Sequence, residues 1–416
     1  MTAAKIERPR GTHDVVPAEQ PKWRLVLEEA ERLCALYGYR PIVTPVFEDT
    51  ALFERTSGPG SDVVQKEMYT FEDRSGRSLT LRAEATAPIC RAYVEHGMYR
   101  DPQPVKLYTV APIHRYAAPQ RGRYREHWQV SVEAIGSDDP SIDAEVIQLY
   151  DTLLRRLGIT EYSLHLNSIG CRECRPAYVE RLRAWFAEND ARLDDETREK
   201  ARLSPLRALD NLDAKPDAVR EALRGAPTIG ESLCEACRAH FAAVRRDLDA
   251  YGVSHTVVPA LVRGLDYYTR TTWEFQGPEG GAQSTLSGGG RYDGLVEEIG
   301  GPPTPGVGFG AGVERLILAL EHAGVEPSPP ATEVFFALDD GAPRARVAQW
   351  LAELRERGVS SDTDYAGRSL KGQLTQASRL GATITVVVRA DGASIRRAGQ
   401  EDVAVALDEV LAGVTA

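Results

Sequence analysis

The segment GVGFGAGVERL constrains the fold more than any other stretch of this sequence. Glycine occupies every second position from Gly306 to Gly312, directly before a helical pattern. Because successive side chains of a strand point to opposite faces, one face of this strand carries no side chains. Such a face can serve as a flat shelf for a planar base, and close strand–helix packing would require it equally. In either case the segment is a strand that leads directly into a helix.

A second group of segments shows the alternation of apolar and polar residues that is typical of half-buried strands. Helical patterns separate them, the clearest being the apolar stripe of residues 19–38, which a glycine closes. Pro45 in the strand that follows argues for an edge or interface position. Long strands interleaved with helices indicate an α+β protein and not a regular βαβ repeat. The predicted strands are residues 40–46, 68–73, 78–82, 105–116, 128–136, 161–168, 254–268 and 269–275.

Changes of composition divide the chain into domains. Residues 171–245 are helical, rich in Arg and Glu, and bracketed by the cysteine pairs CREC and CEAC. We therefore expect a helical insertion within a domain of residues 1–325. A proline-rich linker follows at 326–331. Residues 332–416 then alternate between strand and helix patterns, which predicts a small separate α/β domain.

Charge and apolar content limit the class of protein. The chain of 416 residues has a net charge of −11, so it is not a general binder of polyanions, although a local basic groove remains possible. No apolar run approaches the roughly 18 residues of a membrane span, and the first ten residues lack the apolar run of a signal peptide. Six cysteines are too few for a disulfide scaffold. We therefore expect a soluble cytoplasmic protein.

The segment LVRGLDYYTRTTWEF, residues 261–275, gathers ionic and phenolic groups directly before a strand. Arg263 and Asp266 precede Tyr267 and Tyr268, and the residues that follow are rich in the Thr, Trp and Phe of a strand. One interpretation is that Arg263 merely pairs with Asp266. The other is that Arg263 holds a fixed positive charge for a ligand.

Residues 105–116 and 128–136 are two strands joined by a polar, basic loop. In the second strand Gln129 and Glu133 lie on the polar face, with a serine between them. This face is either the wet side of a half-exposed strand or the floor of a polar pocket. Arg115, beside the loop on the opposing strand, would suit a phosphate oxygen.

Two further segments carry candidate ligand contacts. In LRAEATA, Glu84 and Thr86 can accept from a ligand ammonium group, or they can cap a helix. Arg315 follows the glycine strand in the first turn of a helix, where the helix dipole disfavours a cation and a bound phosphate would compensate. The glycine turn SGGGRYDG, residues 287–294, matches neither a Walker loop nor a dinucleotide-binding fingerprint.

In their order along the chain, these segments resemble the signature segments of class II aminoacyl-tRNA synthetases, most closely those of the histidyl-tRNA synthetase family. The resemblance rests on RGTHDVVP, the helix with the Pro45 strand, the Arg115 strand–loop–strand, the glycine strand with Arg315, LVRGLDYYTR and GGGRYDG. GRSLKGQLTQASRLGA resembles the anticodon-binding domain of the family. The resemblance covers essentially the whole chain. It implies a class II catalytic domain, an antiparallel sheet flanked by helices, with a C-terminal anticodon-binding α/β domain.

This family activates histidine with ATP to histidyl-adenylate and then transfers histidine to the terminal adenosine of its tRNA. By resemblance, Arg115 and Arg263 are the catalytic residues, because they cancel the repulsion between the histidine carboxylate and the α-phosphate. Mg²⁺ would bridge the ATP phosphates. The resemblance also implies a homodimer, with the helix and the Pro45 strand at the subunit interface.

The resemblance assigns three sets of ligand contacts. A pocket that pairs both imidazole nitrogens rejects apolar amino acids of similar size, because it would leave buried polar groups unpaired. The histidine-binding residues are Glu84 and Thr86 for the ammonium group, Gln129, Glu133 and Tyr268 for the imidazole, and Arg263, Tyr267 and Tyr292. The ATP-binding residues are Arg115, Arg123, His127, Gly308, Gly310, Gly312 and Arg315. The tRNA-binding residues are Gln120, Arg368, Lys371 and Arg379.

The chain departs from the family pattern in its second signature segment. Where the family carries Arg-x-Glu-Arg-Pro-Gln, this sequence has Ala117 and Ala118 in place of the Glu and the second Arg. His127 stands where the family has the Phe that stacks on adenine. These departures concern adenine stacking and recognition of the first tRNA base pair, and they leave the histidine site whole.

The cysteines include two CxxC pairs with the spacing of a tetrahedral zinc site. Reduced structural thiols are the alternative, since membership of the family does not require zinc. Cys34 and Cys90 lie in helical patterns and are expected to be buried. The four candidate zinc ligands are Cys171, Cys174, Cys234 and Cys237.

Two other functions stay open at this point. One is a non-catalytic paralogue that regulates ATP phosphoribosyltransferase in histidine biosynthesis. Such paralogues typically lose the Arg263 segment and the C-terminal domain, and this chain has both. The other is a histidine- or RNA-binding module that cannot form an adenylate, which Ala117 and Ala118 make conceivable.

Overall fold

The computed structural model describes residues 5–58, 61, 63–209, 215–278, 284–329 and 331–415. Backbone contacts divide the chain into two units, Met1–Pro327 and Ser328–Ala416. This division falls within the predicted linker, 326–331, of which Pro330 lies outside the described residues. Within the described ranges, no helix is long and apolar enough to cross a membrane.

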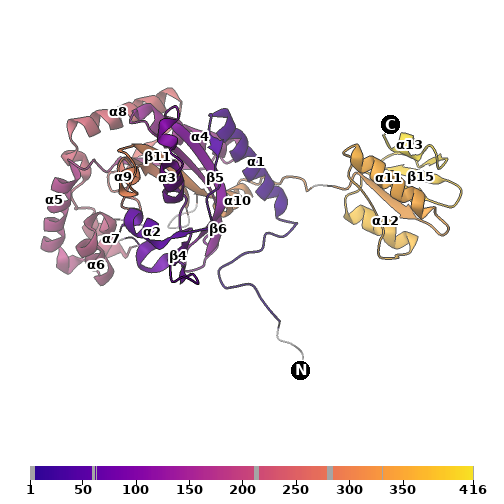
Figure 1. Cartoon of the computed structure of the whole chain (residues 1–416), viewed down its shortest axis with the longest axis horizontal. Helices are drawn as coiled ribbons and strands as arrows, with labels where there is room; N and C mark the ends of the chain where they lie inside the picture. Colours follow the sequence, from indigo (N-terminus) through magenta and orange to yellow (C-terminus); the bar gives the residue numbers. More distant parts are fainter. Residues whose placement is uncertain are drawn as a thin grey trace. The chain divides into compact units, whose positions relative to one another are not determined.

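The first unit combines two sheets with the helices that separate their strands (Figure 1). Its described α-helices are α1 (Gln20–Leu36), α2 (Thr50–Ser57), α3 (Thr86–Glu95), α4 (Pro140–Arg156), α5 (Arg175–Glu188), α6 (Asp195–Leu203), α7 (Asp217–Leu223), α8 (Glu235–Ala250), α9 (Leu295–Glu298) and α10 (Val313–His322). Its described strands are β1 (Arg40–Pro41), β2 (Phe47–Asp49), β3 (Thr70–Glu72), β4 (Ser78–Leu81), β5 (Val105–His114), β6 (Glu126–Ile135), β7 (Ser163–Ser168), β8 (Thr256–Val257), β9 (Thr269–Gln276), β10 (Thr285–Arg291) and β11 (Gly306–Gly312).

An eight-stranded sheet with the order β1-β5-β6-β11-β10-β9-β7-β8 forms the centre of this unit, and β2-β4-β3 form a smaller sheet. The central strands pair antiparallel, from β5 through to β7. Parallel pairing joins β1 to β5 and β7 to β8 at the two edges. The predicted α+β class, an antiparallel sheet flanked by helices, is confirmed. The glycine strand is β11, between β6 and β10.

Helices α1, α4, α8 and α10 cover one face of the large sheet. Their apolar side chains share one core with alternate residues of the strands, including Trp273 of β9 and Phe309 of β11. Because strand side chains alternate between faces, Gly308 and Gly310 point to the opposite face. The apolar positions of β11 therefore build the core, and its glycines leave room on the other side.

The helical insertion lies at one side of the first unit, where Figure 1 shows α5, α6 and α7 together. The predicted range, 171–245, extends from this group into the main core. Its last helix, α8, packs on α4, and Val244 and Leu248 belong to that core. His240 of α8 also lies 2.9 Å from Asp143 of α4 (Nε2–Oδ2). The apolar stripe of α8 determines that this helix packs in the main core. Its charge content alone does not indicate this packing.

Two predicted strands are largely irregular, and both predictions are corrected here by backbone hydrogen bonding. Of residues 40–46 only β1 pairs, and Pro45 lies in an irregular segment because it has no N–H for a ladder. The Thr44 and Pro45 carbonyls instead accept from the buried Arg82 guanidinium at 3.0 and 3.4 Å. Residues 254–268 contribute only β8, and the chain becomes regular again at β9.

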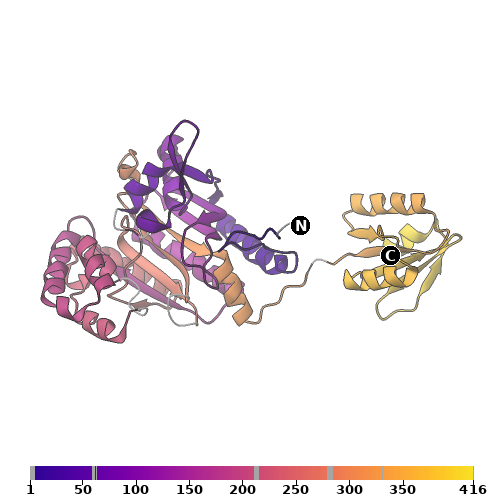
Figure 2. The ribbon, with the colours of Figure 1, turned by 90° about the horizontal axis from the view of Figure 1, so that it is seen from below.

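The second unit is a five-stranded sheet with helices on both faces (Figure 2). The strand order is β13-β12-β14-β15-β16, parallel among the first three strands and antiparallel beyond them. Helices α11 and α13 pack on one face and α12 on the other. Its described elements are β12 (Val334–Leu338), α11 (Arg344–Glu356), β13 (Ser361–Thr363), α12 (Leu370–Arg379), β14 (Ile384–Val388), β15 (Ala393–Arg397), β16 (Val403–Val405) and α13 (Val410–Thr415).

Candidate active site

A cleft of about 340 Å³ opens on the sheet face opposite the covering helices. Strands β6, β9, β10 and β11 contribute to its lining, together with the segments 84–86, 115–127 and 263–268. Among the described residues, five arginines and four glutamates line it, so its formal charge is slightly positive in an acidic chain. The predicted site residues in this lining are Glu84, Thr86, Arg115, Arg123, His127, Gln129, Arg263, Tyr267, Tyr268, Gly310, Gly312 and Arg315.

Of the first-unit residues predicted to contact histidine, ATP or tRNA, four lie outside this lining. Glu133 and Tyr292 are buried behind it, with 0% and 1% of their surface exposed. Gly308 is covered, since a Cβ there would stand 1.9 Å from Oε2 of Glu133. Gln120 is exposed on the loop after β5 and exchanges backbone hydrogen bonds with Arg123. The first three therefore support the wall of the cleft from behind.

Glu133 is the centre of a buried hydrogen-bond cluster. Its Oε1 lies 2.6 Å from Thr86 Oγ1, and its Oε2 lies 2.6 Å from Tyr292 Oη. Burial raises the pKa of Glu133 to about 8, although these two hydrogen bonds act in the opposite direction. Glu133 therefore holds a proton at neutral pH and fixes two hydroxyl groups at the wall of the cleft.

Glu84 caps a helix, as one of its two interpretations predicted, and it also lines the cleft. Its carboxylate accepts from the backbone N–H groups of Thr86 and Ala87, each at 2.7 Å, in the first turn of α3. Tyr267 Oη lies 3.5 Å from Oε2 of the same carboxylate. Burial raises the pKa of Glu84, and the two backbone hydrogen bonds oppose that shift. Capping thus fixes the position of a carboxylate that faces the cleft.

Arg263 has an acidic partner different from the one that the sequence suggested. Its Nη1 lies 3.0 Å from Oε2 of Glu274 on β9. Asp266 pairs instead with Arg207, whose Nε lies 2.9 Å from Oδ1. The Arg263 guanidinium lies against β10 at Gly288, where a Cβ would stand 1.9 Å from Nη2. Arg263 is therefore held on the β9–β10 side of the cleft.

Arg115 enters the cleft from the other side. It directly follows β5, and its Nε donates to the Ala83 carbonyl at 2.7 Å. In the sheet, β6 and β11 separate β5 from β10 and β9. Arg115 and Arg263 therefore line the cleft from opposite sides, and an anion between them would meet two guanidinium groups.

The glycine face of β11 is not a bare shelf, contrary to the prediction for a planar base. A Cβ at Gly310 would stand 1.7 Å from Nε2 of Gln129, and one at Gly306 would stand 2.2 Å from the Tyr292 ring. These glycines make room for side chains of neighbouring segments, which occupy the face themselves. Gly310 and Gly312 still belong to the lining of the cleft.

The predicted nucleotide end of the cleft contains His127, Arg123 and Arg315. Burial, followed by the charge of Arg115, lowers the pKa of His127 to about 3, so its ring is neutral and suited to stacking. Arg123 pairs with Glu67 at 3.0 Å. Nη1 of Arg315 donates to a backbone carbonyl of β10 at 2.6 Å, and burial lowers the pKa of Arg315.

Several residues of the cleft were not identified from the sequence. Glu274 carried a usable signal, because it is a carboxylate between the buried Trp273 and Phe275 on one strand. Glu67 ends the π-helical turn Val63–Glu67, for which the sequence offers no pattern. The unpredicted charged and aromatic residues of the lining are Glu67, Tyr124, Arg207, Glu274 and Glu314.

Comparison with known proteins identifies the family. A family model described as histidyl-tRNA synthetase matches residues 11–316. A histidine--tRNA ligase of Dehalococcoides mccartyi is 47% identical over 92% of this chain and 91% of its own length. A histidine--tRNA ligase of Desulforudis audaxviator is 48% identical over 93% and 91%. The chain belongs to the histidyl-tRNA synthetase family.

Solved structures in this family match the whole fold. Apo histidyl-tRNA synthetase of S. aureus has 35% identity and a TM-score of 0.82, with 99% of this chain and 100% of that chain covered. A Bacillus halodurans protein described as an ATP phosphoribosyltransferase regulatory subunit/histidyl-tRNA synthetase has 25% identity and a TM-score of 0.67, with 94% and 100% covered. Of these two, the synthetase is the more similar in both sequence and structure.

The second unit of this histidyl-tRNA synthetase family member carries the remaining predicted tRNA contacts. Arg368 and Lys371 are exposed at the N-terminal end of α12, where Arg368 Nη1 lies 2.6 Å from Asp364. Arg379 lies at the other end of α12, about 13 Å farther along the helix axis. Tyr365, 76% exposed and not predicted, shares the loop of Arg368. The structure thus brings together Tyr365, Arg368 and Lys371, and separates Arg379 from them.

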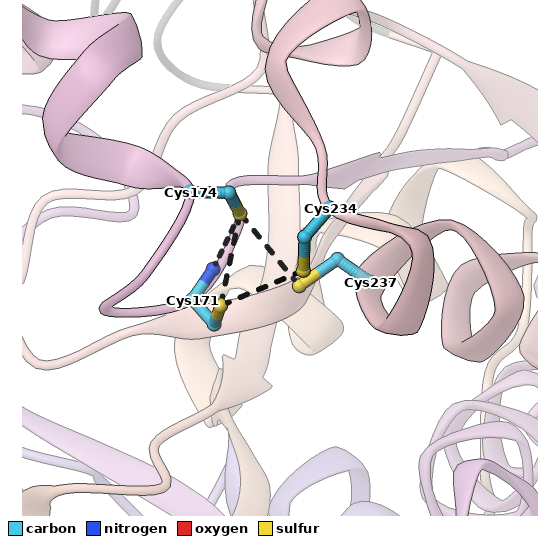
Figure 3. Close-up of side chains that lie close together, drawn as sticks. All are labelled: Cys171, Cys174, Cys234 and Cys237. Atoms are coloured by element: carbon cyan, nitrogen blue, oxygen red, sulfur yellow. Dashed lines mark hydrogen bonds between the residues drawn. The ribbon is translucent and has the colours of Figure 1, made fainter.

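The four candidate zinc ligands converge in the first unit (Figure 3). Their sulfur atoms all lie within 4.8 Å of one another. Cys34 and Cys90 are buried elsewhere, as predicted, with 0% of their surface exposed.

Proposed function

We propose that this chain activates L-histidine with ATP to histidyl-adenylate and then transfers histidine to the 3′ end of tRNA(His). The observation that carries the proposal is that Arg115 and Arg263 line one cleft from opposite sides of that cleft. Membership of the histidyl-tRNA synthetase family supports the same reaction.

The first step brings two anions together. An oxygen of the histidine carboxylate attacks the α-phosphorus of ATP, the bond from that phosphorus to the bridging oxygen breaks, and pyrophosphate leaves with the electron pair. Arg115 and Arg263 neutralise the approaching carboxylate and the charge that grows on the phosphoryl oxygens. Catalysis therefore comes mainly from alignment and electrostatics.

Specificity for histidine rests on the polar wall of the cleft. Glu84, whose position the α3 cap fixes, would bind the α-ammonium group together with Thr86. Gln129 and Tyr268 would pair with the imidazole nitrogens, and Glu133 would act through Thr86 and Tyr292 because it is fully buried behind them. An apolar amino acid would leave these groups unpaired, so discrimination can reach about 10⁴-fold.

ATP would lie with its base against the neutral His127 ring and its phosphates toward Arg123 and Arg315. Mg²⁺ would enter with the triphosphate. The carboxylates of Glu67 and Glu274 in the same lining offer oxygen atoms of the type that Mg²⁺ prefers.

In the second step, a hydroxyl of the terminal ribose of tRNA attacks the carbonyl carbon of the adenylate, and AMP leaves. Gln120, exposed on the loop after β5, is the proposed contact to the acceptor end. Arg368 and Lys371 are the proposed anticodon contacts, and the exposed Tyr365 ring beside them is suited to stacking on an unpaired base. Arg379 would contact a separate part of the tRNA.

We also propose a cytoplasmic homodimer. Val43, Val46 and Phe47 expose 90%, 46% and 50% of their surface in the irregular segment after β1 and at the start of β2. Phe71 on β3, 42% exposed, packs edge-on against Phe47 with ring centroids 6.3 Å apart. An apolar patch of this kind is typical of an interaction surface, and a second copy of the chain is its proposed occupant.

Amino-acid-dependent exchange of pyrophosphate into ATP tests the function directly. The full chain should catalyse exchange with L-histidine and not with other amino acids, and should charge tRNA(His) when tRNA is added. A regulatory paralogue or a binding module would bind histidine without exchange. Absence of histidine-dependent exchange by a folded, histidine-binding preparation would therefore exclude the proposed reaction.

A further inference from the structure

Four cysteines meet where the helical insertion joins the large sheet. Cys171 and Cys174 lie shortly after β7. Cys234 is the N-cap of α8 and Cys237 lies in its first turn, so the two pairs bracket the insertion (Figure 3). We propose that these four thiolates bind one structural Zn²⁺ ion, which fastens the two ends of the insertion to each other and to the wall of the histidine pocket.

The sulfur positions match a tetrahedral metal site. A zinc ion bound by four thiolates at about 2.3 Å requires sulfur–sulfur separations of about 3.8 Å. Three of the six Sγ–Sγ distances are 3.7 Å for Cys171–Cys174, 3.8 Å for Cys171–Cys234 and 3.8 Å for Cys174–Cys237, and all four sulfurs lie within 4.8 Å of one another. A disulfide would bring two sulfurs to about 2.05 Å, so these separations describe ligands around a common centre and not bonded pairs.

The backbone around the first pair is arranged for a metal-bound sulfur. The Cys171 N–H donates to Sγ of Cys174 at 3.2 Å, a contact that stabilises negative charge on that sulfur. Gly170 has φ +72°, and a Cβ there would stand 2.9 Å from the same sulfur. The turn that presents Cys174 therefore depends on glycine both for its conformation and for space.

The ligand set indicates a structural ion. Four protein sulfurs complete the tetrahedron, so no position is open for water or substrate, unlike a catalytic zinc site. Cys174 and Cys237 are buried, with 7% and 1% of their surface exposed, and their partners are half-buried. The two pairs are separated by 63 residues in the chain, so one ion would close the whole insertion into a loop.

The site is connected to the histidine pocket through Arg175, the residue after Cys174. Its guanidinium donates to the carbonyls of Ile169 and Gly170 at 3.0 and 3.2 Å. It also donates to the carbonyl of Tyr268 at 2.5 Å. Since Tyr268 lines the cleft, a metal that fixes the turn at Cys174 also fixes part of the pocket wall.

Metal analysis of the full-length chain tests the proposal without reference to catalysis. Protein purified without added chelator should contain about one zinc per chain, and Co²⁺ exchanged into it should give the visible bands of a tetrahedral tetrathiolate. Cys237→Ala and Cys34→Ala form a matched pair, since both residues are almost fully buried. The first variant should lose the zinc, and the second should retain it.

Loss of the metal should also change the protein physically. Cys237→Ala, or wild-type chain stripped with chelator, should unfold at a temperature lower by about 5 °C or more, and proteolysis within the insertion should become faster. Zinc readdition should reverse both effects in the stripped wild type only.

The proposal is overturned if the reduced wild-type chain takes up no zinc, if it holds iron instead, or if Cys237→Ala retains zinc at the wild-type level. If Cys237→Ala does not fold, the zinc content and the cobalt spectrum of the wild type still test whether the four cysteines bind zinc. The same measurements stand whether or not the chain catalyses histidine-dependent exchange.

Discussion

Charged side chains in the cleft are useful because other groups hold them in place. Arg263 is held by Glu274 and lies against Gly288, whereas Arg115 is anchored on a backbone carbonyl. Both arginines were predicted from the sequence, because the segments that contain them resemble those of a known family. Glu274 could not be identified as the partner of Arg263, because Asp266 is closer along the chain and only the folded sheet brings β9 beside the Arg263 loop.

Removing the Arg263 guanidinium should affect the chemical step more than folding. We expect Arg263→Ala to lower kcat for histidine-dependent pyrophosphate exchange by about 10²- to 10³-fold, because one group that stabilises the transition state is lost. Arg344→Ala, an exposed arginine of the second unit, serves as the control. Equal exchange rates for the two variants would show that Arg263 has no part in the reaction.

Glu133 should make stability depend on pH in a defined direction. Its pKa is about 8 in the folded chain and about 4.3 when unfolded, so the folded state keeps a proton that the unfolded state has released. The stability that this proton contributes is complete below the unfolded pKa and is lost as pH rises to about 8. Glu133→Gln has no such proton to lose, and its amide can still pair with both hydroxyl neighbours.

Urea unfolding between pH 4 and about 9 measures this effect. The stability of wild type relative to Glu133→Gln should fall across the window by more than about 1.4 kcal/mol, the value of one pKa unit, and then become level. The exposed Glu72→Gln provides the reference for the same chemical change at the surface. If the stability of wild type relative to Glu133→Gln does not change with pH, the claim that Glu133 is a buried, protonated carboxyl is wrong.

At the level of elements, alternation predicted most strands of the central sheet. The glycine segment 287–294, interpreted as a turn, instead supplies most of β10 (Thr285–Arg291). The long strands β5, β6 and β9 and the glycine strand β11 lie where alternation and glycine spacing indicated. The prediction of a strand at residues 40–46 was wrong. Its two prolines and its hydrogen bonds to the Arg82 guanidinium influence the backbone more than its β-branched residues do. The interpretation of the β11 glycines was also incomplete. They accommodate side chains from neighbouring segments, which no property of β11 alone reveals.

Substitution of the adjacent β10 glycines Gly288 and Gly289 should therefore affect different properties, the exchange rate in one case and stability in the other. A Cβ at Gly288 meets the guanidinium end of the Arg263 side chain and no backbone atom, so Gly288→Ala should displace that guanidinium and lower exchange by about 10²-fold with little loss of stability. A Cβ at Gly289 meets the Gly308 carbonyl at 2.4 Å and the Trp273 ring at 2.5 Å, so Gly289→Ala should lower the unfolding temperature. Kinetics and thermal unfolding of both variants test this division.

Gly230→Ala provides the control, because a Cβ there has nothing within 4 Å. It should match wild type in both assays. If Gly288→Ala keeps the wild-type exchange rate, the close contact of Arg263 with β10 does not matter for the reaction.

At the scale of the whole molecule, the chain comprises two units whose boundary the proline-rich composition of residues 326–331 indicated. The position of α8 was harder to assign from composition, because its charge resembles that of the insertion while its apolar stripe packs on α4. The proposed dimer rests on an apolar patch that is exposed in this chain, at Val43, Val46 and Phe47.

Placing a charge on this patch should disrupt the proposed dimer. Val43 is 90% exposed, so Val43→Asp should leave the fold of each chain intact and shift the solution mass from two chains to one. Val403→Asp, at an exposed valine of the second unit, should remain dimeric. Light scattering at micromolar concentration measures the solution mass of both variants. If Val43→Asp remains a dimer, the interface lies elsewhere.

The central claim concerns two positive charges that meet across one cleft. A crystal structure of the full chain with L-histidine and a non-hydrolysable ATP analogue measures it directly. We predict that the guanidinium groups of Arg115 and Arg263 both lie about 3 Å from oxygens of the histidine carboxylate or the α-phosphate, on opposite sides of the reacting atoms. Guanidinium groups that point away from each other, with no nucleotide between them, would contradict the claim.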